Sequence, residues 1–227
     1  MMFETACGSV IGSAHLRAGR NGQDGWAIER DAGGNVVIVV TDGCGSARHS
    51  EVGAKLGASL VAREILSRAT SAIDWDAAAT AVVKQLSTFA ETLDVNDHLL
   101  FTVVGALITP VDTIVFHAGD GFFAINGATE RIGPYRDNAP PYLAYALLGG
   151  PEPSFTIAQR VPTGEVESIL IATDGAEPLV STFEFSNFTQ VSRNPDAIRR
   201  RLFLLTRPGS ALLDDDTTIA LARRRTA

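Results

Sequence analysis

Residues 36–43 read Val36-Val37-Ile38-Val39-Val40-Thr41-Asp42-Gly43, an apolar run that stops at an acidic residue and a glycine. A short run rich in β-branched residues is typical of a β-strand. Glycine lets the backbone turn sharply after the strand and leaves the preceding carboxylate open to a ligand. This stretch therefore predicts a strand that presents a carboxylate at its end.

The same arrangement recurs along the chain. Asp120 and Asp174 also end apolar strand-like runs, and each is followed by glycine. Asp24 and the acidic run 214–216 lie in similar contexts, although any single Asp-Gly pair is also a common turn. Carboxylates gathered at one sheet edge repel one another unless a cation neutralises them. An all-oxygen ligand set favours Mg²⁺ or Mn²⁺ over Zn²⁺, so the pattern predicts such a metal site.

The remaining periodicities outline the fold. Two long segments carry apolar residues at helical spacing and predict amphipathic helices that cover a sheet, with Ser50 and Asp74 as N-caps. A shorter helix is expected near 196–205, and Asn126-Gly127 indicates a two-residue hairpin. The helical positions are Ala54, Ala58, Val61 and Ile65, then Trp75, Ala79, Val82, Leu86, Phe89 and Leu93.

Strands and helices do not alternate regularly, which favours a mixed α/β sandwich over a parallel doubly wound sheet. The segment 133–153, rich in proline, is expected to be a loop. The expected strands are Val36–Thr41, Phe101–Thr109, Asp112–Ala118, Phe122–Asn126, Ser168–Thr173 and Thr218–Ala222.

The composition is that of an ordinary globular protein. The chain has 227 residues, 45% of them hydrophobic, and we expect one domain over residues 1–227. The formal charge of −7 disfavours binding to nucleic acid or to an anionic membrane. No apolar run approaches the roughly 20 residues that span a bilayer, and the first residues lack a signal-peptide pattern, so a cytoplasmic location is expected.

The acidic motifs resemble, in order, those of the metal-dependent protein phosphatases of type 2C, most closely a compact bacterial branch. The motifs that carry the resemblance are Gly12-Ser13-Ala14-His15, Gln23-Asp24, Val40-Thr41-Asp42-Gly43-Cys44-Gly45, Ala118-Gly119-Asp120-Gly121, Ala172-Thr173-Asp174-Gly175 and Asp215-Asp216-Thr217-Thr218-Ile219. The resemblance implies a four-layer α-β-β-α sandwich, in which two antiparallel β-sheets pack between helices.

The resemblance also implies a centre of two Mn²⁺ or Mg²⁺ ions at one end of the sandwich. By position, Asp42 would bridge both ions, the Gly43 carbonyl would bind one, and Asp174 and Asp215 would hold the other side. Asp24 would bind a metal or its waters. Asp42, Asp174 and Asp215 are thus the implied catalytic residues.

A third, weaker metal site is implied at Asp120, the position that holds such an ion in bacterial members. Gly121 stands where a serine is common in the family. The implied reaction is hydrolysis of phosphoserine and phosphothreonine in proteins by a metal-activated water. Phosphorylated proteins would be the substrates, the chain would oppose a Ser/Thr kinase, and it is expected to be a monomer.

The phosphate-binding residue is left open by the sequence. The usual arginine of the family lies five residues before the first aspartate, where this chain has Gly19. Arg20, Arg17 and His15 are the candidates. Cys44 stands where some members carry a histidine proposed as general acid, and water is the alternative proton donor.

Two other functions remain as alternatives to a protein phosphatase. One is a regulatory or binding module of the same fold with weak catalysis, which missing metal ligands would favour. The other is a phosphatase of small phosphoesters, which a comparison of kcat/KM on phosphopeptides and metabolites would identify.

Overall fold

The computed structural model describes residues 3–69, 72–136, 139–181, 188, 194, 196–207 and 212–225. Within these residues, ten strands form two five-stranded sheets, ordered β1-β10-β9-β6-β7 and β2-β3-β4-β5-β8, and all neighbouring strands are antiparallel. The strands are β1 (Phe3–Val10), β2 (Asp24–Arg30), β3 (Val36–Gly43), β4 (Phe101–Ile108), β5 (Asp112–Ala118), β6 (Gly121–Ile125), β7 (Ala128–Ile132), β8 (Thr156–Pro162), β9 (Ser168–Ala172) and β10 (Thr217–Arg224).

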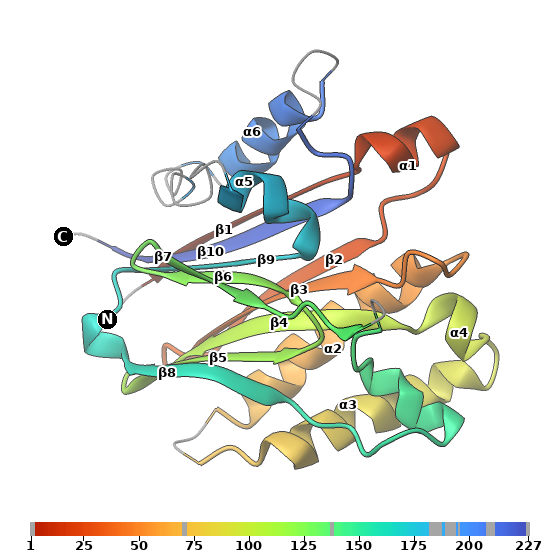
Figure 1. Ribbon diagram of the computed structural model, residues 1–227. Helices are drawn as coiled ribbons and strands as arrows, with labels where there is room; N and C mark the ends of the chain where they lie inside the picture. The colour runs from red at the N-terminus through yellow and green to blue at the C-terminus, as the bar shows by residue number, and fades with distance from the viewer. Residues whose placement is uncertain are drawn as a thin grey trace.

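The two sheets pack face to face between helices, as Figure 1 shows. Helix α2 packs on β2 and β3, α3 packs on α2, and α6 packs on β1 at the other side of the sandwich. This arrangement confirms the predicted α-β-β-α sandwich. The helices are α1 (Ser13–Ala18), α2 (Ser50–Ser67), α3 (Trp75–Ala90), α4 (Val95–His98), α5 (Glu177–Ser181) and α6 (Ala197–Leu205), with 3₁₀ helices η2 (Leu143–Leu148), η3 (Thr163–Glu165) and η4 (Asp174–Ala176).

Strand β3 shows why the sequence folds into layers. Successive side chains of a strand point to opposite faces of the sheet. Val36, Ile38 and Val40 accordingly join the core between the two sheets, whereas Val37 and Val39 join the core beneath α2 and α3. An uninterrupted apolar run is therefore required, because both faces of β3 are buried.

The local predictions are confirmed with small shifts at the element ends. Asn126 (φ 52°) and Gly127 (φ 86°) form the turn between β6 and β7. Asp74 caps α3 by accepting a hydrogen bond from the Ala77 N–H at 2.9 Å. Helix α3 ends at Ala90, before the last residue of the apolar pattern.

Two expectations need correction, and several elements were not predicted. Ser50 is not an N-cap: His49 occupies that position, and the Ser50 hydroxyl donates a hydrogen bond to the Cys44 carbonyl at 3.0 Å. The segment 133–153 is not only loop, because η2 forms within it and buries Leu143. The sequence analysis also missed β1, β2, β8 and α1, whose apolar patterns are weaker because many of their residues are only partly buried or are exposed.

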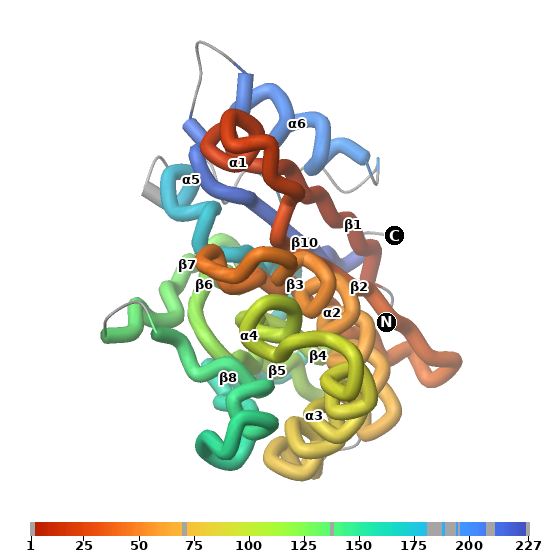
Figure 2. Tube along the Cα trace, turned by 90° about the vertical axis from the view of Figure 1, so that its right-hand side faces the viewer, coloured from red at the N-terminus to blue at the C-terminus, as the bar shows by residue number. Residues whose placement is uncertain are grey.

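Figure 2 turns the molecule so that α1, α4 and the connection from β3 into α2 face the viewer. Asp42, near the carboxyl end of β3, and Asp24, at the start of β2, lie at this end of the sandwich. Among the described helices, none combines the length and apolar character needed to cross a lipid bilayer.

Candidate active site

Five acidic residues lie at the ends of five strands. Asp24 opens β2, Asp42 lies near the end of β3, Asp120 joins β5 to β6, Asp174 follows β9 and Asp215 precedes β10. All except Asp24 line one pocket of about 140 Å³. The structure thus brings together residues that are far apart in the sequence, and it places Asp24 behind the pocket as the register partner of Asp42.

Asp24 is buried, with 4% of its surface exposed, and only one of its carboxylate oxygens has a partner. The Thr173 hydroxyl donates a hydrogen bond to Oδ2 at 2.9 Å. Oδ1 is buried without a hydrogen-bond partner among the described residues. A buried carboxylate oxygen without a partner is costly, which makes it a position where a bound cation or water stabilises the fold.

The carboxylates perturb one another. Burial raises the pKa of Asp24 to about 7, and the neighbouring Asp216 carboxylate adds to the effect. Burial, followed by the negative charges of Asp24, Asp174 and Asp215, raises the pKa of Asp42 well above its usual range. Burial, Asp120 and Asp215 raise the pKa of Asp174 to about 6. The pocket is therefore a site of concentrated negative charge that favours cations.

Asp120 lies in a tight turn between two glycines with positive φ, Gly119 (109°) and Gly121 (144°). A Cβ atom at Gly119 would lie 2.6 Å from Thr102, and one at Gly121 would lie 2.5 Å from the Ala172 carbonyl oxygen. Strands β4 and β9 thus both lie close to the turn that holds Asp120. This close contact requires glycine on both sides of Asp120. Burial raises the pKa of Asp120 as well.

Asp216 is a buried residue whose role the sequence analysis missed. Its Oδ1 accepts a hydrogen bond from the Gly12 N–H at 2.7 Å, and its Oδ2 accepts one from the Gln23 N–H at 2.5 Å. Its neighbour Asp215 faces the pocket instead. The signal available in the sequence was the position of Asp216 directly before β10, but the partners of this carboxylate are about two hundred residues away.

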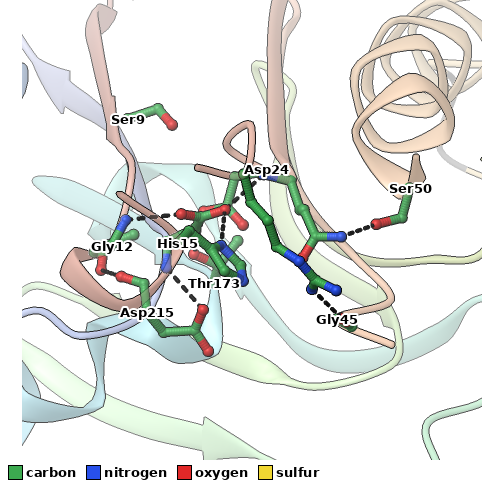
Figure 3. Close-up of polar contacts among 12 residues, drawn as sticks. Ser9, Gly12, His15, Asp24, Gly45, Ser50, Thr173 and Asp215 are labelled. Carbon is green, nitrogen blue, oxygen red and sulfur yellow. Dashed lines mark hydrogen bonds and ion pairs between the residues drawn. The ribbon is translucent and has the colours of Figure 1, made fainter. Parts of the chain in front are cut away.

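The three candidates for phosphate binding occupy different places. His15 lines the carboxylate pocket, and its Nδ1 lies 3.0 Å from Asp216 Oδ2, a close ion-pair contact rather than an aligned hydrogen bond. Arg20 lines an adjacent pocket of about 180 Å³ and donates a hydrogen bond to the Gly45 carbonyl at 2.9 Å. Arg17 is 69% exposed and lies 3.7 Å from Asp214. Figure 3 shows His15, Asp24, Thr173 and Asp215 gathered together, with Gly45 and Ser50 to one side.

The sequence analysis also missed Tyr142 and Thr102 as residues that line the pocket. Tyr142 comes from the proline-rich segment before η2, where no periodicity marks a residue that faces the pocket. Burial and a hydrogen bond with Cys44 raise the pKa of Tyr142. Cys44 itself contacts Ser46, with Sγ 3.2 Å from the hydroxyl.

The donor set fits a divalent cation with oxygen ligands. The residues that line the pocket supply carboxylates and the Gly43 backbone, without a lysine or arginine to neutralise them. The unpartnered Oδ1 of Asp24 adds a donor beside Asp42. As they stand, the described side chains form no cluster of three or more His, Cys, Asp or Glu groups around one point. Carboxylate and carbonyl oxygens are nevertheless the ligand types that Mg²⁺ and Mn²⁺ prefer.

Comparisons with known proteins show the family and the fold. Residues 11–202 match the family model described as protein phosphatase 2C. The Ser/Thr phosphatase Stp1 from Staphylococcus aureus has a similar fold, with a TM-score of 0.66 at 14% identity over 100% of this chain and 96% of that one. The Ser/Thr phosphatase PstP/Ppp from Mycobacterium tuberculosis gives a TM-score of 0.65 at 15% identity, with both chains fully covered.

A structure of the PstP catalytic domain in complex with two manganese ions is also similar, with a TM-score of 0.63 at 16% identity over 97% of each chain. A comparison with curated protein sequences found no significant match. The fold is that of a type 2C phosphatase. The family model covers most of the sequence, and the chain belongs to the protein phosphatase 2C family.

Proposed function

We propose that this protein is a Mn²⁺- or Mg²⁺-dependent phosphatase of phosphoserine and phosphothreonine in proteins. The observation that carries the proposal is the gathering of acids from five strand ends around one pocket, with the buried Asp24 Oδ1 left without a partner. Family membership supports a phosphatase activity. Retention of all the expected acidic positions argues against a regulatory module that has lost its metal ligands.

In this proposal Asp42 would contact both cations, and its carboxylate interacts with those of Asp24, Asp174 and Asp215. The Gly43 carbonyl would bind one of the ions, Asp174 and Asp215 would hold the other side, and Asp24 would bind a metal or its waters. Asp120, which interacts with Asp174, is the candidate ligand of a third ion.

When bound, two such ions lower the pKa of a shared water and neutralise charge on the phosphoryl oxygens. The protein's contribution is to keep this set of carboxylates close together at one end of a rigid sandwich. Because Asp24, Asp42 and Asp174 have raised pKa values without metal, cation binding releases protons and becomes stronger as the pH rises.

Phosphorylated proteins are the proposed substrates. The protein would then reverse the reaction of a Ser/Thr kinase. The pocket of about 140 Å³ is small, which suits a single phosphorylated side chain. Arg20, in the adjacent pocket, is placed to meet an anionic group of such a peptide.

The test is turnover by the purified protein of p-nitrophenyl phosphate and of phosphoserine and phosphothreonine peptides, with millimolar Mn²⁺ or Mg²⁺ and with chelator. We expect turnover of both substrate types that depends on the metal. An inert protein under these conditions would contradict the proposal. If kcat/KM is higher for small metabolites than for phosphopeptides, small phosphoesters are the substrates instead.

A further inference from the structure

His15 is the residue in the carboxylate pocket whose role the metal site does not explain. Its side chain is 16% exposed, and its Nδ1 is buried against Asp216. Nε2 has no hydrogen-bond partner among the described residues, and it is not among their buried unpartnered atoms. The ring therefore has one nitrogen held inside the protein and one nitrogen available to a group in the pocket.

The Asp216 carboxylate contacts His15 at the buried Nδ1 of the ring. This carboxylate is 3% exposed and accepts hydrogen bonds from two backbone N–H groups, those of Gly12 and Gln23. Backbone donors fix the position of the carboxylate, and its contact with Nδ1 at 3.0 Å fixes the orientation of the ring. An imidazole held by a buried carboxylate keeps its other N–H directed at the substrate, which is the arrangement a proton donor needs.

The other groups that line the pocket are poorer proton donors. Tyr142 holds its proton too tightly, because burial raises its pKa. The carboxylates are the proposed metal ligands, so they are deprotonated when the site is loaded. The pocket is lined by Gly43 and Gly45 on either side of Cys44, not by the thiol itself.

We propose that His15 is a catalytic residue that protonates the leaving oxygen of the phosphoester, and that Asp216 is its positioning residue. The inference rests on the proposed phosphatase function. Water oxygen forms the new bond to phosphorus and gives one proton to solvent. The ester P–O bond breaks, and its electron pair stays on the leaving oxygen, which takes the Nε2 proton of His15. Solvent then reprotonates His15, so the net reaction is ester plus water to alcohol plus phosphate.

The decisive experiment compares leaving groups. p-Nitrophenolate leaves without protonation, whereas phenolate and the serine alkoxide need a proton. For His15→Gln, kcat on phenyl phosphate and on a phosphoserine peptide should fall about 10²–10⁴-fold, the usual contribution of general acid catalysis. The fall on p-nitrophenyl phosphate should be less than about tenfold, because general acid catalysis contributes little when the leaving group needs no proton.

Two further variants test the mechanism of the loss. Imidazole added to His15→Ala should restore turnover of phenyl phosphate, an effect that a structural role would not produce. Asp216→Asn should show the same selectivity for poor leaving groups with a smaller loss. His98→Gln, a histidine outside the pocket, is the matched control and should keep wild-type rates on both substrates.

Mn²⁺ titration by calorimetry checks that His15→Gln retains the metal site, independently of turnover. If kcat/KM falls equally on all substrates because KM rises while kcat is unchanged, the proton-donor role is overturned. His15 would then be assigned to phosphoryl binding. Unchanged turnover in His15→Gln would also overturn it. A wild-type protein inactive on every substrate would instead refute the phosphatase function on which the inference rests.

Discussion

Asp24 and Asp42 are register partners in the antiparallel ladder between β2 and β3, so two carboxylates lie directly opposite each other. Like charges at such a cross-strand pair are destabilising. Both are buried, and both have a raised pKa. This unfavourable pair lies at the end of the sandwich where the proposed cations bind. Its effect on the free energy of unfolding can be measured.

The stability of the metal-free protein should fall as the pH rises through the range set by Asp24. The pKa of this group is 3.8 in its reference state and about 7 in the fold. Between these values the folded protein binds more protons than the unfolded chain, so the free energy of unfolding decreases with increasing pH. Asp174 adds to the decrease up to about pH 6.

Thermal melts in chelator from pH 4 to pH 8 check this expectation against Asp24→Asn, which keeps an acceptor for the Thr173 hydroxyl. The Tm of the variant should exceed that of wild type by a margin that grows towards pH 7. Added Mn²⁺ should raise the wild-type Tm more at pH 7.5 than at pH 5. A margin that shrinks with pH would show that the carboxylate is not held protonated by the fold.

Asp42→Asn and Asp174→Asn should abolish metal-dependent turnover without unfolding the protein. We expect kcat to fall more than about 100-fold, because even groups that only orient metal ligands are worth about 10–100-fold. The Tm of the metal-free variants should stay the same or rise, since each substitution removes a charge from a repelling cluster. Asp112→Asn is the control, because Asp112 begins β5 at the end of the strand that lies away from Asp120 and the pocket. Full activity in either site variant would refute the metal-ligand assignment.

Gly57→Ala should destabilise the fold although alanine favours helix. A Cβ at this position of α2 would lie 2.1 Å from the ring of Phe101, which is fully buried. Helix propensity contributes about 0.8–1 kcal/mol in favour of alanine, but overpacking a dense core costs about 1–3 kcal/mol. The net loss should lower the Tm by a few degrees in a thermal melt. Gly164→Ala, with no atom within 4 Å, should leave the Tm unchanged, and equal melts for both variants would contradict the packing argument.

Arg20→Ala should raise the KM for a phosphopeptide more than Arg17→Ala does. Arg20 lines the pocket beside the carboxylates and is held by the Gly45 carbonyl, whereas Arg17 lies on the exposed face of α1 near Asp214. Steady-state kinetics of the two variants measured side by side would decide between them. A larger effect of Arg17→Ala would overturn the assignment of phosphate binding to Arg20.

Local signals in the sequence were sufficient for the strongest elements. The β3 run is apolar at every position because both its faces are buried, so its pattern needs no partner to be recognised. The weaker strands were missed for the opposite reason. In β8, alternate residues are exposed and half-buried, and Pro162 ends the strand, so that the local pattern resembles a loop.

The sequence by itself determined that acidic residues end the apolar strands, because strand propensity and the turn after each aspartate depend on neighbouring residues. Tertiary structure alone decided what each acid does in the run 214–216. Asp214 is at the surface near Arg17, Asp215 faces the pocket, and Asp216 turns inward to the Gly12 and Gln23 N–H groups. Three identical side chains in succession differ only in the groups that the fold brings to them from residues about two hundred positions away, and no local pattern carries that information.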